Sequence, residues 1–207
     1  PSGNFIPHEE VLSLATWAKT RNILLIVDES FVDFSTDSTS NTLLQNNILD
    51  SFPNLVVIKS ISKSYGVPGL RLGVLATSNT SLIQIIRKDV AIWNINSFAE
   101  YYMQIFSKYE KDYLQACQKF IAERKRFYTE LQKISFLRVI PSQANYFLCE
   151  VVGMSSKELV LKLLETNILV KDCSEKFAFD KKNYIRIAIR NEHDNNKIIK
   201  SLTGIEN

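Results

Sequence analysis

A loop between two apolar runs constrains this chain more than any other feature of its sequence. Leu55–Lys59 and Leu72–Thr77 have the apolar, β-branched character that predicts strands. The order helix, strand, loop, strand in this part of the chain predicts an α/β architecture. The loop is rich in glycine and carries two hydroxyls, an amine and a guanidinium: Ser60, Ser62, Lys63 and Arg71.

These loop residues have the chemistry of a phosphate site beside a reactive amine. Hydroxyls, backbone N–H groups of a glycine-rich loop and one arginine together bind phosphate well. A lysine beside that phosphate can form a Schiff base with an aldehyde cofactor, which predicts pyridoxal 5′-phosphate (PLP) and Lys63 as its lysine. Because the amine must be deprotonated, we expect Lys63 to be buried near other positive charge. Singly, these residues could be a solvated lysine, turn-forming serines and a surface arginine; together they favour the cofactor.

A carboxylate ends an earlier apolar run. Ile23–Val27 is continuously apolar, which predicts a buried parallel strand, and Asp28 follows it. A carboxylate there needs a partner, and the protonated pyridine nitrogen of the cofactor would be one. Keeping that nitrogen charged would make the ring a better electron sink. The alternative is a helix N-cap or a structural ion pair.

Composition excludes several other classes of function. The 207 residues carry 25 basic and 22 acidic side chains with no basic block, so we expect neither a nucleic-acid nor a membrane partner. The apolar runs are too short to span a bilayer. Three widely spaced cysteines without a CxxC pair predict reduced thiols in the cytoplasm, with no disulfide frame and no metal site: Cys117, Cys149 and Cys173.

Periodicity predicts the remaining elements. We expect helices at Pro7–Arg21, Ser81–Lys88, Ser97–Gln132, Ser155–Thr166 and Glu192–Leu202, with one helical turn at Thr42–Gln45. We expect further strands at Phe136–Ile140, Asn145–Val151, Ile168–Val170 and Tyr184–Ile189. The long helical stretch lacks glycine and proline, so it predicts a bridge between domains. The predicted domains are a partial large α/β domain (1–95), a connecting helical segment (96–134) and a small C-terminal α+β domain (135–207).

Five motifs in one order give the chain a family resemblance. They are Pro1–Asn4 (PSGN), Val27–Phe31 (VDESF), Ser60–Lys63 (SISK), Gly69–Gly73 (GLRLG) and Tyr184–Ile187 (YIRI). The sequence resembles the class I/II aminotransferases of PLP fold type I, in the branch of histidinol-phosphate aminotransferase and threonine-phosphate decarboxylase. The resemblance covers nearly the whole chain and implies a PLP-dependent homodimer that acts on a small amino substrate.

The resemblance also implies a role for each motif residue. Lys63 would bind the cofactor covalently and carry a proton between the substrate Cα and the cofactor C4′. Asp28 would pair with the pyridine nitrogen. The phosphate ligands would be Ser60, Ser62 and Arg71. Arg186 would bind the substrate α-carboxylate as a bidentate fork, although Arg186 shares a strand face with Arg190 and either could be a surface residue.

Two departures from the family pattern affect the functional prediction. The family motif begins with an asparagine before the position of Pro1, so we expect the chain to be the C-terminal part of a longer protein. Phe31 stands where many relatives have tyrosine, and with Val67–Gly69 and Val170–Ser174 it favours the decarboxylase branch. The resemblance to the aminotransferases nevertheless predicts transamination of an amino acid or a phosphorylated amino compound as the reaction. The alternatives are a PLP-dependent decarboxylase and a catalytically silent dimerisation fragment.

Overall fold

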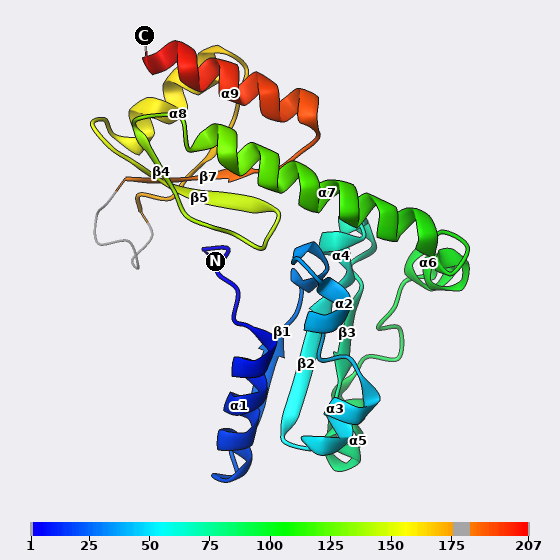
Figure 1. The fold of residues 1–207 in the computed structure, drawn as a ribbon. Coiled ribbons are helices and arrows are strands. Elements are labelled where there is room, and N and C mark those ends of the chain that lie inside the picture. The colour runs from blue at the N-terminus through cyan, green and yellow to red at the C-terminus, as the bar shows by residue number, and fades with distance from the viewer. Residues whose placement is uncertain (1, 176–182, 207) are drawn as a thin grey trace. The chain divides into compact units, whose positions relative to one another are not determined.

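The chain divides into two compact units, and a computed structural model describes residues 2–175 and 183–206 (Figure 1). The first unit is Ile6–Cys117, and the second joins Pro1–Phe5 to Gln118–Asn207. Pro1, with which the first family motif begins, lies outside the described residues. Within the described ranges, no helix combines the length and the apolar character needed to cross a membrane.

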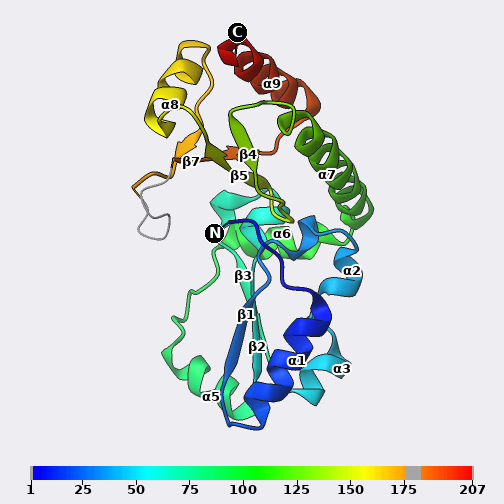
Figure 2. The same cartoon turned by 60° about the vertical axis from the view of Figure 1, so that its left-hand side comes forward.

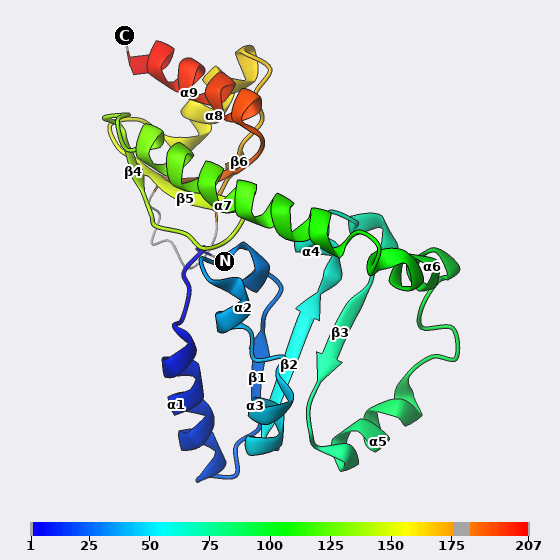
Figure 3. The same cartoon turned by 45° about the vertical axis from the view of Figure 1, so that its right-hand side comes forward.

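The first unit is built on a three-stranded sheet in the order β1 (Leu25–Asp28), β2 (Leu55–Ser60), β3 (Gly73–Ala76). Strands β1 and β2 are parallel, whereas β2 and β3 are antiparallel, with Ser60 opposite Gly73. Figure 3 shows β2 running towards α4 (Ile61–Ser64) and β3 running back beside it. The register therefore brings both ends of the glycine-rich loop to one edge of the sheet.

Helices cover one face of this sheet. Figure 2 shows α1 (His8–Lys19) and α3 (Asn46–Ser51) on the same side of it, where Val11 and Ile48 pack with Leu55 and Val57. On the other face Ile26 is 59% exposed, so the prediction that Ile23–Val27 is a buried strand is wrong. The reason is that β1 is an edge strand with one face uncovered in the described part of the chain. The other elements of the unit are η1 (Val32–Phe34), α2 (Ser38–Asn41), η2 (Pro68–Leu70), α5 (Thr80–Asp89) and α6 (Ser97–Phe106).

The second unit has an antiparallel sheet in the order β4-β5-β7-β6. Its strands are β4 (Leu137–Val139), β5 (Tyr146–Val151), β6 (Lys171–Asp172) and β7 (Tyr184–Ala188), and its helices are α7 (Glu110–Leu131, from Gln118 onward), α8 (Ser156–Glu165) and α9 (Glu192–Glu206). Figure 1 shows the three helices on one side of the sheet. There Phe127, Leu163 and Leu202 are fully buried in one core with Phe147 and Ile185 of the strands.

A glycine fixes the N-terminal segment to this second unit. The carbonyl of Gly3 accepts a hydrogen bond of 3.0 Å from the backbone N–H of Gln143. Gly3 has a φ of +89°, and a Cβ at this position would lie 2.3 Å from Ser142 Oγ. Both the left-handed backbone and the close approach require glycine at this position.

Most predicted elements are confirmed, and three differ for identifiable reasons. Residues Thr42–Gln45 are not helical, because the Leu43 N–H and the Thr42 hydroxyl bind the Glu29 carboxylate instead of closing a helical turn. The strand predicted at Ile168–Val170 lies at Lys171–Asp172, because the N–H of Ile168 remains bonded to Leu163 O at the end of α8.

The helix predicted over Ser97–Gln132 is interrupted between α6 and α7. The Tyr65 ring packs against Phe106 at the end of α6 and stacks on Tyr113 in the first turn of α7, with centroid distances of 5.0 and 4.3 Å. Tertiary packing of these aromatic rings accompanies the break and outweighs local helix propensity. The division into units falls inside α7, and the predicted domain boundaries stay a prediction.

Candidate cofactor site

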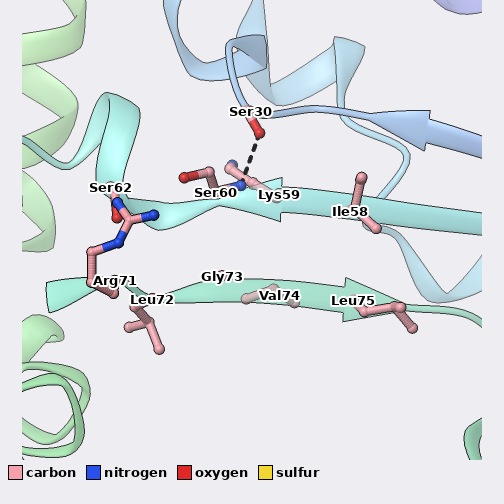
Figure 4. Close-up of a pocket in the computed structure, with 10 residues that line it drawn as sticks. All are labelled: Ser30, Ile58, Lys59, Ser60, Ser62, Arg71, Leu72, Gly73, Val74 and Leu75. Carbon is pink, nitrogen blue, oxygen red and sulfur yellow. Dashed lines mark hydrogen bonds between the residues drawn. The ribbon is translucent and has the colours of Figure 1, made fainter. Parts of the chain in front are cut away.

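The glycine-rich loop of the first unit borders a pocket of about 460 Å³ (Figure 4). Ser60 ends β2, Ser62 lies in α4, Arg71 follows η2 and Gly73 begins β3, and all four line the pocket. The volume is within the range of small-molecule sites, which is roughly 300–1,000 Å³. The pocket thus gathers the serines and the arginine that the sequence singles out.

The polar groups of this pocket fit a phosphate. The hydroxyls of Ser60 and Ser62 make no hydrogen bond with any residue in 2–175 or 183–206. Arg71 lines the same pocket (Figure 4), and its guanidinium donates a long hydrogen bond of 3.4 Å to Pro68 O. Two uncommitted hydroxyls and a guanidinium are donors that an anion with several oxygens can use.

Arg71 adopts a backbone conformation that is uncommon for a residue with a side chain. Its φ and ψ are 54° and 39°, in the left-handed region. This conformation costs an L-residue roughly 1–2 kcal/mol. Strain of this kind is concentrated at binding sites, where the surrounding structure enforces it.

Lys63 lies in α4, directly after Ser62, and differs from its prediction. Its side chain is exposed rather than buried, because α4 is a single turn of four residues that leaves this position at the surface. The amine lies 5.8 Å from the centroid of the Phe31 ring. It takes part in no ion pair among the described residues, so it is open to a ligand.

A second lysine, Lys59, lines the pocket and has the opposite character (Figure 4). Lys59 is 8% exposed, and its Nζ lies 2.7 Å from Asp33 Oδ1. A buried amine held in an ion pair is not available to an aldehyde, whereas the Lys63 amine is exposed. The geometry thus favours Lys63 over Lys59 as the reactive amine.

Asp28 is connected to the pocket through Ser30. Asp28 Oδ1 accepts hydrogen bonds from the Ser30 N–H, at 2.9 Å, and from the Ser30 hydroxyl. The Ser30 hydroxyl in turn accepts from the backbone N–H of Ser60 at 3.0 Å. Asp28 is exposed, contrary to its expected place at the end of a buried strand, because β1 is an open edge. Its Oδ2 has no hydrogen bond within the described residues and can accept one from a ligand.

Arg186 belongs to the second unit. It lies on β7, half-buried, with its guanidinium 4.7 Å from the centroid of the Tyr146 ring. Arg190 is paired with Asp194 at 2.7 Å, whereas Arg186 forms no ion pair with a described residue. This difference favours Arg186 over Arg190 as the group that can bind a carboxylate.

Comparison with known proteins identifies the family. The model of the family "Aminotransferase class I and II" matches residues 1–202. The chain belongs to this family. The resemblance read from the five motifs is therefore confirmed, and membership of the aminotransferase family implies pyridoxal 5′-phosphate as the cofactor.

Two relatives of this aminotransferase-family chain are named as decarboxylases. It is 31% identical to a threonine-phosphate decarboxylase of Salmonella typhimurium and 29% identical to L-serine phosphate decarboxylase Cj1436c of Campylobacter jejuni. The alignments cover 99% of this chain but 55% and 53% of these relatives, so the chain spans about half their length.

A solved structure agrees with the fold. The histidinol-phosphate aminotransferase from Clostridium acetobutylicum superposes with a TM-score of 0.90 at 31% identity. The match covers 100% of this chain and 61% of that one. The predicted α/β architecture of PLP fold type I, present in part, is thereby confirmed.

Other polar residues next to the aminotransferase motifs are not evident from the sequence. Ser30, Asp33 and Lys59 make buried or half-buried hydrogen bonds around the loop. The sequence signals for this ion pair were Lys59, at the end of an apolar strand, and Asp33, shortly after Asp28. Neither identifies its partner, since the two residues are 26 positions apart.

Proposed function

We propose that this chain carries the cofactor lysine and the phosphate ligands of a PLP-dependent enzyme. The reaction we propose first is transamination of an amino acid or a phosphorylated amino compound. The observation that supports a cofactor site is the pocket lined by Ser60, Ser62 and Arg71, which belong to the same loop as Lys63.

Each of the candidate site residues would have a separate role. Lys63 would attach the cofactor through its amine and, once the substrate amine displaces it, take the proton from the substrate Cα. The Oδ2 atom of Asp28 would accept a hydrogen bond from the ring nitrogen. Arg186 would hold the substrate α-carboxylate with two parallel N–H donors. When bound, PLP supplies the electron sink for the bond that breaks at Cα.

Decarboxylation is a second candidate reaction, and the names of the Salmonella typhimurium and Campylobacter jejuni relatives favour it. The two reactions differ in whether the Cα–H or the Cα–carboxylate bond breaks. Incubation of the PLP-loaded chain with O-phosphothreonine or O-phosphoserine, each of which has both a Cα–H bond and a Cα–carboxylate bond, separates them. Transamination converts PLP to pyridoxamine 5′-phosphate without loss of CO2, whereas decarboxylation releases CO2 and leaves PLP.

The first test is borohydride reduction of the protein incubated with PLP, followed by peptide mass mapping. We expect a pyridoxyl adduct on Lys63 and none on Lys59. The Arg71→Ala variant should lose most of the labelling, and Arg87→Ala is the matched control because Arg87 is exposed in the same unit. Labelling spread evenly over surface lysines of the folded protein would contradict the proposal.

A catalytically silent dimerisation fragment is the third candidate. Folded protein without a Lys63 adduct at any PLP concentration would favour it.

A homodimer and a cytoplasmic location also belong to the proposal. The free, buried state of Cys117, Cys149 and Cys173 supports the location. Sedimentation equilibrium of the chain tests the dimer.

A further inference from the structure

One carboxylate holds the segment that carries the candidate cofactor residues from both sides. Asp33 lies in η1, and its Oδ1 accepts from Lys59 Nζ at 2.7 Å. Its other oxygen, Oδ2, accepts from the Ser64 hydroxyl at 2.5 Å. Lys59 immediately precedes Ser60, and Ser64 immediately follows Lys63. The four residues between the two contacts therefore include Ser60, Ser62 and Lys63.

Both contacts are of a strong type. The Lys59 and Asp33 side chains are 8% and 16% exposed, so water screens their attraction weakly. A hydroxyl that donates to a carboxylate makes a charge-assisted hydrogen bond, which is stronger than one between neutral groups. Each oxygen of Asp33 thus has one strong donor, and each donor lies on a different side of the segment.

The same turn also contacts Lys63 itself. Phe31, directly before η1, lies 5.8 Å from the Lys63 amine, measured from its ring centroid. Beyond Ser64, the Tyr65 ring stacks on Tyr113 at 4.3 Å and fixes the C-terminal side of α4. The exposed side chain of Lys63 therefore extends from a backbone segment that has packing or hydrogen-bond contacts both before and after it.

We propose that Asp33 is a positioning residue that fixes the backbone of residues 60–63 and thereby aims the Ser60 and Ser62 hydroxyls and the Lys63 amine. This inference deepens the proposed function and rests on it for the role of Lys63. The ion pair with Asp33 also occupies the amine of the buried Lys59, so that the exposed amine of Lys63 is the one of these two that is open to an aldehyde.

Ser64→Ala tests the contact on the Lys63 side, because it removes the hydroxyl and leaves the ion pair intact. Ser78→Ala is the matched control, since the half-buried Ser78 hydroxyl donates to Leu49 O at 2.6 Å in the same unit. Loss of a hydrogen bond to a charged group corresponds to about tenfold in an equilibrium constant. In the cofactor-free protein, we expect amide hydrogen exchange over residues 61–66 to be about tenfold faster in Ser64→Ala and unchanged in Ser78→Ala.

Binding of PLP gives the second readout. The Kd for PLP should rise about tenfold in Ser64→Ala, and Ser64→Thr, which keeps the hydroxyl, should restore both the Kd and the exchange rate. Ser64→Ala with the exchange rate of the parent, or Ser78→Ala with equal acceleration over residues 61–66, would overturn the proposal.

A double variant tests Asp33 directly. Asp33→Asn combined with Lys59→Met removes the carboxylate without leaving a buried, unpaired cation. We expect faster exchange over residues 60–66 and a weaker Kd for PLP, and a parental exchange rate would overturn the role of Asp33. If the parent chain does not bind PLP, the proposed function fails, while exchange in the cofactor-free protein still decides whether Asp33 holds the segment.

Discussion

The hydroxyl of Ser30 accepts the backbone N–H of Ser60 at 3.0 Å, across a sequence separation of 30 residues. The same hydroxyl donates to Asp28, so one buried side chain connects the carboxylate at the end of β1 with the last residue of β2. The parallel pairing of β1 and β2 makes this connection possible, since Asp28 is opposite Ile58. The two strands thus fix the relative positions of two proposed cofactor ligands.

Ser30→Ala should therefore lower both stability and cofactor binding. The backbone N–H of Ser60 loses its acceptor, and Oδ1 of Asp28 keeps only the Ser30 N–H as a donor. This change costs about 1–2 kcal/mol in the free energy of unfolding by urea. The Kd for PLP should rise about tenfold, because Asp28 and Ser60 lose their common hydrogen-bond partner.

Thr42→Val is the control for that experiment. It also removes a hydroxyl that donates to a carboxylate, at 2.8 Å to Glu29 Oε2, and it keeps the shape of the side chain. We expect a similar loss of stability without a change in PLP affinity. Equal effects of both variants on the Kd would contradict the connection from Ser30 to the site.

Glu29 should make stability depend on pH in a defined direction. Burial raises the pKa of the Glu29 carboxyl above its ordinary value of 4.5, although the Leu43 N–H and the Thr42 hydroxyl oppose this effect. Above pH 4.5 the folded state then binds more protons at this site than the unfolded state, so stability falls as pH rises through the folded pKa. Glu29→Gln removes this contribution.

Urea unfolding of both proteins across pH 4 to 8, roughly the range in which a raised carboxyl titrates, checks this prediction. The parent should lose stability relative to Glu29→Gln as pH increases above 4.5 and then keep a constant difference. Parallel stability curves would show that the carboxyl has the same pKa in the folded and unfolded states.

Gly3→Ala should destabilise the second unit more than Gly153→Ala. Both glycines have positive φ, +89° and +83°, so each substitution carries a backbone cost of about 1 kcal/mol. A Cβ at Gly3 would also overlap Ser142 Oγ, whereas nothing lies within 4 Å of a Cβ at Gly153. This overlap should cost Gly3→Ala about 1–3 kcal/mol more in the free energy of unfolding. Thermal unfolding of the two variants measures the difference. Equal destabilisation would show that the N-terminal segment moves aside freely.

Tyr146 should hold the Arg186 guanidinium in place. The ring centroid lies 4.7 Å from the guanidinium carbon, and such a contact contributes about 0.5–1 kcal/mol when partly exposed. Tyr146→Phe should preserve the order of the Arg186 side chain, and Tyr146→Leu should lose it. Relaxation of the Arg186 Nε–H signal in NMR measures this order, and equal relaxation in both variants would exclude a role for the ring.

The sequence predicts this fold well wherever local pattern determines structure. Leu55–Lys59 forms a strand because its apolar, β-branched residues are buried on a sheet, and the actual strand differs by one residue. The interruption between α6 and α7 could not be predicted in this way, because it accompanies packing of Tyr65 against Phe106 and Tyr113. The exposure of Ile26 depends on which face of the sheet is covered, which periodicity alone does not give.

The candidate site shows the same division between local and distant information. Ser60, Ser62 and Arg71 lie close together in sequence, and their residue types alone predict a shared phosphate site. The pairing of Asp33 with Lys59 and Ser64 spans 26 and 31 residues and depends on strand register. Such contacts follow only from the folded chain, and they are the ones proposed to position the local motif.

At position 71, the left-handed backbone favours one residue for thermal stability, whereas the proposed phosphate site needs another. Glycine is the residue that this φ of 54° suits best, and Arg71→Gly would relieve roughly 1 kcal/mol of strain. It would also remove the guanidinium from the pocket lining. Directed evolution for thermal tolerance alone would therefore favour a chain that melts later and lacks the guanidinium proposed to bind the cofactor phosphate. Arginine at this position is consistent with selection on the bound state rather than on the free protein.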